Sequence, residues 1–368
     1  MKVIQYLAVA LFAALAVFAQ NETTPNATIF ELLSTNNRTL RTARFIDLLN
    51  SDAGYRPVID LLSNSTANLT VFVPNDNTLN RISRAYRSYN QAHNISSTSE
   101  YPPANWSYHN VTVLDVLQYH VVNESFLLTN LTTGNVTVAF SMLSNSSINH
   151  YINSTLPLLI QPNATYENAT NQTWLDTNAK YLRFHVSNGV NSSTVINNDL
   201  NATNGHVNII QSGKYMLHTL LIPPLEPSVV IPEVRNVSYL AEALRKYPML
   251  NETLNNATNF TIFAPDSKSF QLSQAEGMNN DTLRQLALSH IVYGLYFTTN
   301  FTQNATINNG EFNLTTFNNN ATLPASVNAT SSQITLNGTA KVIRSNILFN
   351  NGIMHIIDRP LNITNATA

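Results

Sequence analysis

Cysteine is absent from this chain of 368 residues, so no disulfide bond can staple a domain. This excludes the small, disulfide-dense modules that are common among secreted proteins, and it leaves core burial to hold each domain together. The sequence has the material for such cores, because 43% of its residues are hydrophobic. A chain of this length is typical of two domains of ordinary size.

Charged side chains are also scarce. They make up 11% of the residues, against about 25% in an ordinary soluble protein, and the formal net charge is only −2. A protein that binds nucleic acid through its phosphates needs a basic surface, so this composition predicts no nucleic-acid partner. With so little charge, another hydrophilic group must keep the surface in contact with water.

Residues 1–19 are typical of a secretory signal peptide. Lys2 precedes a mostly apolar run, and the small residues Val17 and Ala19 suit the two positions that signal peptidase requires. A membrane anchor is the alternative, but the run is short and leads directly into Asn21. The final residues, LNITNATA, lack the apolar tail of a glycolipid anchor. We therefore expect a secreted, extracellular protein with no stable membrane anchor.

Asparagine, serine and threonine supply a candidate for the missing hydrophilic layer. About 31 N-x-[ST] triplets occur, about threefold more than independent placement of these residues would produce. Each triplet is an acceptor for N-glycosylation in the secretory pathway, so we predict that sugar replaces charge as the solubilising layer. Candidate acceptors along the chain are Asn26, Asn64, Asn94, Asn105, Asn130, Asn145, Asn163, Asn191, Asn236, Asn256, Asn304 and Asn328.

Three landmarks occur twice in the same order, which indicates a duplicated domain. The first is a box that reads TVFVPNDNTL in the first half of the chain and TIFAPDSKSF in the second. The second is a histidine in an apolar run, LQYHVV around His120 and ALSHIV around His290. The third is an Asn-Gly turn before alternating apolar residues, NGHVNII from Asn204 and NGIMHIID from Asn351.

The box has the chemistry of a short buried strand. Phe72 and Phe263 lie within β-forming residues, and each copy ends in a proline, Pro74 or Pro265. Proline has no N–H to donate to the ladder, so we expect the strand to end there. The two phenylalanines are therefore predicted to be core residues of their domains.

The residues after each box predict a helix start. Asp76 in the first copy, and Ser267 with support from Asp266 in the second, have side chains that can cap a helix. The histidine runs have helical spacing of their apolar residues. The glycines of the late motif, Gly205 and Gly352, mark a tight turn that leads into the last strand.

These landmarks resemble those of the fasciclin domain family. TIFAPDSKSF is similar to the family's T-x-F-A-P-x-[DN] box, Tyr119-His120 matches its Tyr-His motif, and NGIMHIID matches its late turn. The second copy has Ser289 in place of the tyrosine. The resemblance covers nearly all of the mature chain. It implies an α+β fold of two tandem fasciclin-like domains, each a wedge-like β-sandwich of about seven strands with packed helices.

The landmarks also predict the domain boundaries. We expect a first fasciclin-like domain at 26–222, a Pro-rich linker at 223–232 and a second domain at 233–362, after the signal peptide at 1–19. The linker segment LIPPLEPSVVIP is rich in proline, which favours extended polyproline II and a semi-rigid join.

Relative to the second domain, the first carries two insertions of roughly twenty residues each, a length that is either functional or merely solvated. One lies near residues 84–110 and the other within 143–180. The first insertion is rich in aromatic residues, which suit sugar stacking or a protein contact if they are exposed. These residues are Tyr86, Tyr89, Tyr101, Trp106 and Tyr108.

No enzyme motif stands out in the sequence. It has no H-E-x-x-H, no G-x-S-x-G and no Gly-rich phosphate loop, and its nine histidines lack metal-ligand spacing. We therefore predict no catalytic residue, no metal and no cofactor. A glycosidase could still bring two distant carboxylates together in space, and the sequence leaves that alternative open.

Two short motifs have both a structural and a functional interpretation. The resemblance associates the motif of His120 and His290 with adhesion, but a histidine between apolar neighbours is more often a buried, hydrogen-bonded residue, and we favour the structural role. The tripeptide Leu114-Asp115-Val116 spells an integrin-recognition sequence. It falls on the expected helix, with Leu114 toward the core, so we interpret it as a chance occurrence.

Two hypotheses for the function remain. The first is a secreted, heavily N-glycosylated protein of cell adhesion and of the extracellular matrix or cell wall, with cell-surface or matrix proteins as partners. The alternative is a protein that binds or modifies cell-wall carbohydrate, with a cell-wall polysaccharide as its partner. Saturable binding of a defined polysaccharide favours the alternative, and turnover of one would make the protein an enzyme.

Overall fold

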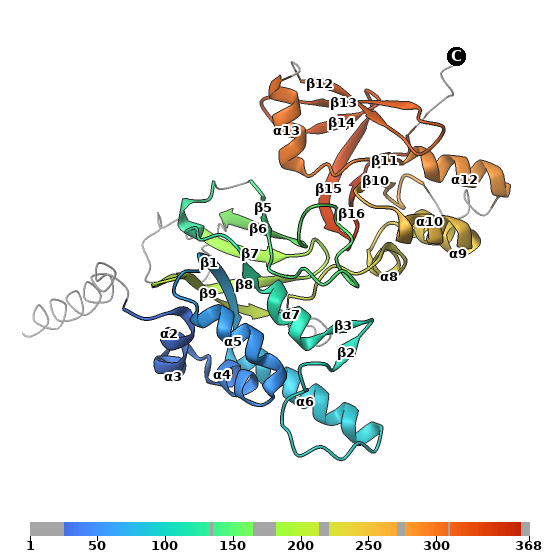
Figure 1. Ribbon diagram of the computed structural model, residues 1–368. Helices are drawn as coiled ribbons and strands as arrows, with labels where there is room; N and C mark the ends of the chain where they lie inside the picture. Colours follow the sequence, from blue (N-terminus) through green and yellow to red (C-terminus); the bar gives the residue numbers. More distant parts are fainter. Residues whose placement is uncertain are drawn as a thin grey trace, which may run out of the picture.

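The computed structural model describes residues 26–132, 135–164, 182–212, 221–270, 277–307 and 310–361. The expected signal peptide lies outside the described residues. Two units of the same architecture follow one another along the chain, each with a seven-stranded sheet and a group of helices (Figure 1). The expected α+β fold with tandem domains is therefore confirmed.

The first domain has the strand order β4-β1-β9-β8-β7-β6-β5, and β2 and β3 form a separate small ribbon. Its helices are α2 (Ile29–Thr35), α3 (Asn37–Leu40), α4 (Ala43–Asn50), η2 (Ala53–Tyr55), α5 (Arg56–Ser63), α6 (Asp76–Ala92), α7 (Val113–Tyr119) and η3 (Leu128–Asn130). Its strands are β1 (Leu69–Pro74), β2 (Ser107–Tyr108), β3 (Val111–Thr112), β4 (Val121–Val122), β5 (Thr137–Phe140), β6 (Pro157–Ala164), β7 (Leu182–Ser187), β8 (Ser192–Ala202) and β9 (Gly205–Ser212).

The second domain repeats this order as β11-β10-β16-β15-β14-β13-β12. Its helices are α8 (Pro227–Glu233), α9 (Ser238–Lys246), α10 (Pro248–Asn256), α12 (Asn280–Ser289) and α13 (Thr298–Ile307). Its strands are β10 (Phe260–Pro265), β11 (Ile291–Tyr293), β12 (Glu311–Thr315), β13 (Thr322–Val327), β14 (Ile334–Leu336), β15 (Ala340–Leu348) and β16 (Gly352–Ile357).

Each sheet curls until its two edges nearly meet. A single bridge, Val122 to Ser141 in the first domain and Val292 to Thr316 in the second, joins the edge strands. The architecture is thus a near-barrel with most helices on one side, rather than two separate sheets of a wedge. In the second domain, α13 packs instead against β12 and β13 and contributes Phe301 to the core of the barrel. The curled shape lets one core fill the barrel while a second lies between the sheet and the helices.

The strands at the centre are buried on both faces. β1 pairs in parallel with β9, and β10 pairs in parallel with β16, and every residue of β1, β10 and β16 is buried. Strands covered on both faces read as continuous apolar runs instead of alternating ones. This explains why the box and the late motif are the most apolar segments of each copy.

The expected linker is largely helical, so polyproline II is wrong for residues 227–232. Pro227 occupies the first turn of α8, where a backbone N–H has no acceptor within the helix, so the missing N–H of proline costs no hydrogen bond. Val230 and Ile231 of this helix are buried in the core of the second domain. Tertiary packing therefore overrides the extended preference of the proline-rich segment, and the described residues before this helix, 221–226, are in neither helix nor strand.

The two domains contact each other directly. One apolar cluster contains Leu159 of the first domain together with Phe297, Leu348 and Ile353 of the second, and all four are buried. The N–H of Leu348 also donates to the carbonyl of Asn188 across the interface, at 2.9 Å. The relative position of the domains is thus supported by packing as well as by the connecting chain.

The second insertion of the first domain reaches into the second domain. The hydroxyl of Tyr151 donates to the carbonyls of Phe349 and Gly352, at 3.2 and 2.9 Å. The N–H of His150 donates to the carbonyl of Asn350 at 2.9 Å. We call residues 150–152 the clasp, because they hold the late turn of the second domain from outside.

Replacing Tyr151 with phenylalanine should loosen this contact. The change removes a donor that both carbonyls share, although the Gly352 carbonyl still accepts from the N–H of Phe349, and we expect a cost of about 1–3 kcal/mol. We expect calorimetry to show a lower melting temperature and more independent melting of the two domains. Tyr108→Phe is the matched control, since Tyr108 is 66% exposed and belongs to the β2–β3 ribbon of the first domain. If the two variants melted alike, the clasp would not couple the domains.

Candidate functional site

The phenylalanines of the box are core residues in both domains. Phe72 and Phe263 have no exposed surface and lie inside the two barrels. The Phe263 ring stacks on His355, with centroids 5.7 Å apart, and meets Phe301 edge-on at 6.2 Å. Pro74 and Pro265 are the last residues of β1 and β10, at the end of each buried strand.

The cap of α6 lies one residue earlier than the sequence suggested. Asn75, in extended backbone conformation, is the N-cap, and its Oδ1 accepts from the N–H of Thr78 at 3.0 Å. Asp76 is the first helical residue, and its carboxylate instead accepts from the N–H of Arg44 at 2.8 Å. The prediction of Asp76 as the cap was wrong because a cap needs the non-helical backbone that directly follows the strand.

The second copy shows the same shift. Asp266 follows Pro265 as Asn75 follows Pro74, and its Oδ1 accepts from the N–H of Lys268 at 3.3 Å. The hydroxyl of Ser267 does not cap this turn, contrary to the prediction. It accepts from the N–H of Ser238 at 2.9 Å and so joins the turn to α9.

His120 ends α7 and is hydrogen-bonded at both ring nitrogens. Its Nδ1 lies 2.7 Å from the carbonyl of Val116, one turn earlier in the helix. Its Nε2 accepts from the N–H of Leu221 at 3.2 Å. The ring is therefore neutral, with the proton on Nδ1, and it ties the segment after the last strand to the helix.

His290 occupies the same position in the second domain. Its Nδ1 lies 2.7 Å from the carbonyl of Leu286, and its Nε2 accepts from the N–H of Leu361 at 2.9 Å. Burial lowers the pKa of both His120 and His290 to about 4, although the bond from Nδ1 opposes the shift. Neither ring is available to a partner, because both are almost wholly buried.

The tyrosine beside His120 also faces inward. Tyr119 is fully buried, and its hydroxyl donates to the carbonyl of Pro157 at 2.7 Å. Ser289 stands in its place in the second domain, donates to the carbonyl of Gln285 and accepts from Asn318, both at 2.8 Å. The two residue types thus fill the same position with different hydrogen bonds inside the fold.

The asparagines of the late motif close helix ends. The Asn204 amide donates to the carbonyl of Leu62 at the end of α5, at 3.0 Å. The Asn351 amide donates to the carbonyl of Leu254 in α10 at 2.7 Å. In both domains, a side chain before the last strand satisfies carbonyls that the helix leaves open.

The glycines of the same motif are required by close backbone contact. A Cβ atom on Gly205, whose φ is +137°, would lie 1.9 Å from the carbonyl oxygen of Leu69. A Cβ on Gly352 would lie 2.8 Å from that of Phe260. A side chain at either position would push the last strand away from the box.

The motif residues therefore form the scaffold of each domain, not a reactive site. Among the described residues, no three histidine or acidic side chains are grouped to hold a metal ion. Asp115 of the integrin-like tripeptide is buried and caps α7, where its Oδ2 accepts from the N–H of Thr112 at 2.8 Å. It cannot be reached by a receptor without unfolding the helix start.

Where the structure describes them, the asparagines of the N-x-[ST] triplets lie outside the cores. None of the 24 such asparagines whose burial is described is buried. Of the candidate acceptors, Asn191 and Asn304 are half-buried, and the side chain of Asn163 lies outside the described residues. The remaining candidates are exposed: Asn26, Asn64, Asn94, Asn105, Asn130, Asn145, Asn236, Asn256 and Asn328.

The buried asparagines are a different set. Among the residues whose burial the structure describes, eight asparagines are buried, and none of them stands in an N-x-[ST] triplet. Had burial been independent of the triplet, several of the eight would fall within one. The eight are Asn75, Asn90, Asn188, Asn204, Asn208, Asn346, Asn350 and Asn351.

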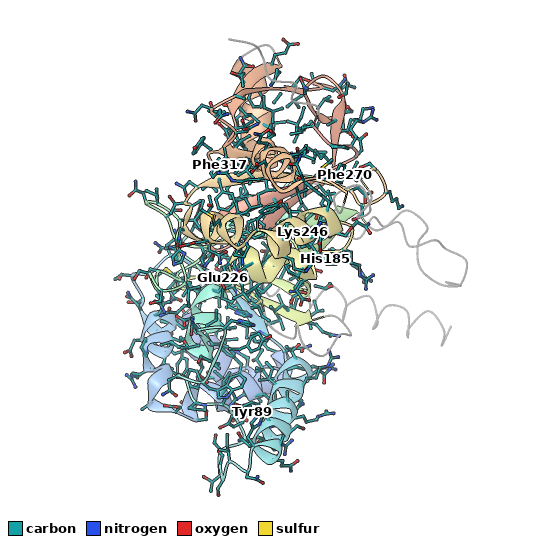
Figure 2. All side chains as sticks on the ribbon, turned by 90° about the vertical axis from the view of Figure 1, so that its right-hand side faces the viewer. Tyr89, His185, Glu226, Lys246, Phe270 and Phe317 are labelled. Carbon is teal, nitrogen blue, oxygen red and sulfur yellow. The ribbon has the colours of Figure 1, made fainter. Side chains whose placement is uncertain are left out.

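The aromatic insertion lies at the end of the first domain that is farthest from the second (Figures 1 and 2). Tyr86 and Tyr101 are buried, and Trp106 packs edge-on against Tyr86 and Tyr89 with centroids 6.1 and 5.7 Å apart. Only Tyr89 and Tyr108 are well exposed, at 41% and 66%. Most of these rings therefore support the insertion from inside.

Comparison with known proteins agrees with the repeated motifs. A family described as Fasciclin, the fasciclin domain, matches residues 33–212 and 235–363, which is most of the chain. The chain is a member of the fasciclin domain family. Among solved structures, it is similar to a fasciclin domain pair from the insect cell adhesion molecule fasciclin I, with 18% identity. That match covers 88% of this chain and 97% of the other, with a TM-score of 0.38.

None of the curated proteins matches the chain. Fasciclin domains are associated with cell adhesion, occur in extracellular and cell-surface proteins, and are generally non-catalytic. In the part of the fasciclin chain that the structure describes, no helix combines the length and apolar character needed to cross a bilayer.

Proposed function

We propose that this fasciclin protein is secreted, carries many N-glycans and works in cell adhesion or in the organisation of a matrix or cell wall. Its partners are cell-surface or matrix proteins, or a cell-wall polysaccharide, and it catalyses no reaction. The extracellular association of the family supports the location, and the two copies of the domain suit multivalent contact with a repetitive surface.

The main support for the proposal is that the buried asparagines and the asparagines of N-x-[ST] triplets are two different sets. A glycan is bulky and hydrophilic, so an acceptor that became buried would block folding. A chain that passes through the secretory pathway must therefore keep N-x-[ST] triplets out of its cores. In the described part of this chain, eight asparagines are buried and all eight lie outside such triplets.

The alternative is a protein that binds cell-wall carbohydrate. A polar hollow between α6 and the loop of residues 94–100 favours the binding of sugar, because amide, hydroxyl and charged side chains line it. A carbohydrate-modifying enzyme has no comparable support among the described residues.

Intact mass before and after enzymatic removal of N-glycans tests the glycosylation. We expect the secreted protein to begin at or near Gln20 and to lose the mass of many glycans. The stripped protein should aggregate, because a charged content of 11% leaves little else to keep it soluble. A mass change equivalent to only one or two glycans would contradict the proposal.

The interaction itself is tested by a pull-down of the secreted, glycosylated protein on intact cells and on purified wall polysaccharides. We expect saturable binding to at least one of these surfaces and no release of sugar or peptide products. Absence of binding to every surface would remove the adhesion role, and product release would make the protein an enzyme.

A further inference from the structure

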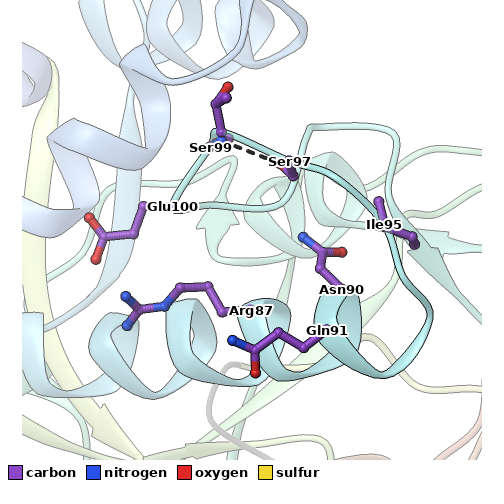
Figure 3. Close-up of a pocket in the computed structure, with 8 residues that line it drawn as sticks. Arg87, Asn90, Gln91, Ile95, Ser97, Ser99 and Glu100 are labelled. Carbon is purple, nitrogen blue, oxygen red and sulfur yellow. Dashed lines mark hydrogen bonds between the residues drawn. The ribbon is translucent and has the colours of Figure 1, made fainter.

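A hollow lies on the first domain between the C-terminal half of α6 and the loop of residues 94–100 (Figure 3). Its volume is about 430 Å³, within the range of small-ligand sites. Most of its lining is polar and comes from side chains that can bind hydroxyl groups. The main lining residues are Arg87, Asn90, Gln91, Ser97, Ser99 and Glu100. We call this feature the α6 hollow.

Asn90 is the unusual residue of the α6 hollow. It is only 7% exposed, and its amide points into the hollow (Figure 3). Asn75 and Asn204, also buried, use their side chains to close helix ends. The Asn90 side chain makes no hydrogen bond to any described residue. Neither polar atom of this amide is among the buried unpartnered atoms of the described residues, so its donor and its acceptor are open to the hollow and free to bind a ligand.

The wall opposite Asn90 is held in place before any ligand arrives. Glu100 forms an ion pair with Arg44 of α4 and accepts from the hydroxyl of Ser83 in α6 at 3.2 Å. The bond to Arg44 lowers the pKa of Glu100 and so keeps it an acceptor. Ser99 donates to the carbonyl of Tyr101 at 2.8 Å. Such preorganisation reduces the entropy that binding must overcome.

The chemistry of the lining selects the ligand class. Arg87 and Glu100 carry opposite charges on the lining, and the positive charge of Arg87 helps to lower the pKa of Glu100. Because the two charges offset each other, the α6 hollow does not favour an anion. Amide, guanidinium, carboxylate and hydroxyl groups together can pair with the neighbouring hydroxyls of a sugar ring. Ile95, 47% exposed, adds apolar surface for the ring's C–H groups.

We propose that the α6 hollow binds a neutral hexose unit of a glycan. The proposal rests on the proposed function, for which it names a contact site. The same sugar chemistry has two sources: a wall polysaccharide, or the N-glycans on another copy of this chain. The insertion that forms the hollow belongs to the first domain, so we expect one such site per chain.

Binding of soluble neutral mannan and β-glucan to the full, glycosylated protein tests the site, with polygalacturonate as an acidic comparison. We expect saturable binding of a neutral polymer by the wild type. Asn90→Ala and Gln91→Ala should each bind it with about tenfold weaker affinity, because each variant loses one or two hydrogen bonds to the sugar. Asn77→Ala is the matched control, because Asn77 is an exposed asparagine of α6 outside the hollow. Asn90→Ala should melt like the wild type, since no hydrogen bond within the protein is lost.

The proposal is overturned if no neutral polymer binds, or if all three variants bind equally. If cells or walls are still bound in that case, the proposed function stands and only the α6 hollow is excluded. If copies of the glycosylated protein associate with one another, and this association is lost when the N-glycans are removed enzymatically, the N-glycans of a second copy are the sugar that the hollow binds. Binding to purified wall polymer without self-association would identify the wall.

Asn94, an exposed candidate acceptor on the same loop, does not line the α6 hollow. An Asn94→Gln variant should therefore bind the neutral polymer at least as tightly as the wild type. Loss of binding in this variant would mean that the sugar on Asn94, and not the hollow, makes the contact, and would also overturn the proposal.

Discussion

Between pH 6.5 and pH 4, the protein should lose much of its stability, because three buried histidines must stay neutral in the fold. Burial lowers the pKa of His120, His290 and His355 from 6.5 to about 4. The unfolded chain binds these protons near pH 6.5, so unfolding takes up protons in this range and stability rises with pH. The contribution is complete above pH 6.5 and is lost as the pH falls toward 4, by roughly 3 kcal/mol for each histidine.

The chain offers its own control for this effect. His355 is paired with Phe263 in the parallel strands of the second domain, and Asn208 is paired with Phe72 at the same place in the first. His355→Asn should therefore fold and should reduce the pH dependence of unfolding. We would measure chemical unfolding of both proteins at several values between pH 7 and pH 4. An unchanged slope would show that His355 does not titrate in this range.

Phe263→Ala should lower the free energy of unfolding by about 3–5 kcal/mol. The ring is completely buried in the barrel, and its removal leaves a cavity between Phe301 and His355 that the surrounding strands cannot close. Thermal and chemical melts of the whole chain would measure the loss, and the transition of the second domain should be the one that moves.

Two further substitutions show whether the effect depends on burial. Phe72→Ala removes the equivalent ring from the first domain and should have a similar cost there. Phe140→Ala removes a ring that is 42% exposed and should cost much less. If Phe263→Ala melted like Phe140→Ala, the box would not be a core anchor.

The parts of the fold that the sequence predicted are those that depend on local patterns. The box, the histidine run and the Asn-Gly turn combine β-forming residues, helical spacing and turn residues, and each falls on the element that its pattern indicates. The duplication reinforced them, because Phe72 and Phe263 occupy equivalent places. Both the family and the tandem α+β fold followed from these segments.

The parts that were missed depend on tertiary contacts. The segment of α8 reads as a linker because of its prolines, and only the packing of Val230 and Ile231 makes it helical. The cap at Asn75 was misplaced by one residue because the strand's end, not the residue type, decides the cap. Asn90 is one asparagine among many, and its unpartnered state depends on the loop that covers it. Its position outside any N-x-[ST] triplet was the one available signal.

The clasp also determines how the pair would respond to tension. If the two ends of the chain are pulled apart, the small set of bonds around Tyr151 and Leu348 carries load in series with the two sheets, whose central strands share many more hydrogen bonds. The interface should therefore separate first, while both barrels stay intact. Residues 221–226 can span at most about 20 Å, which keeps the separated domains close together. Undocking at the clasp would thus lengthen the molecule in a small step, and the short tether would favour its reversal when the load falls.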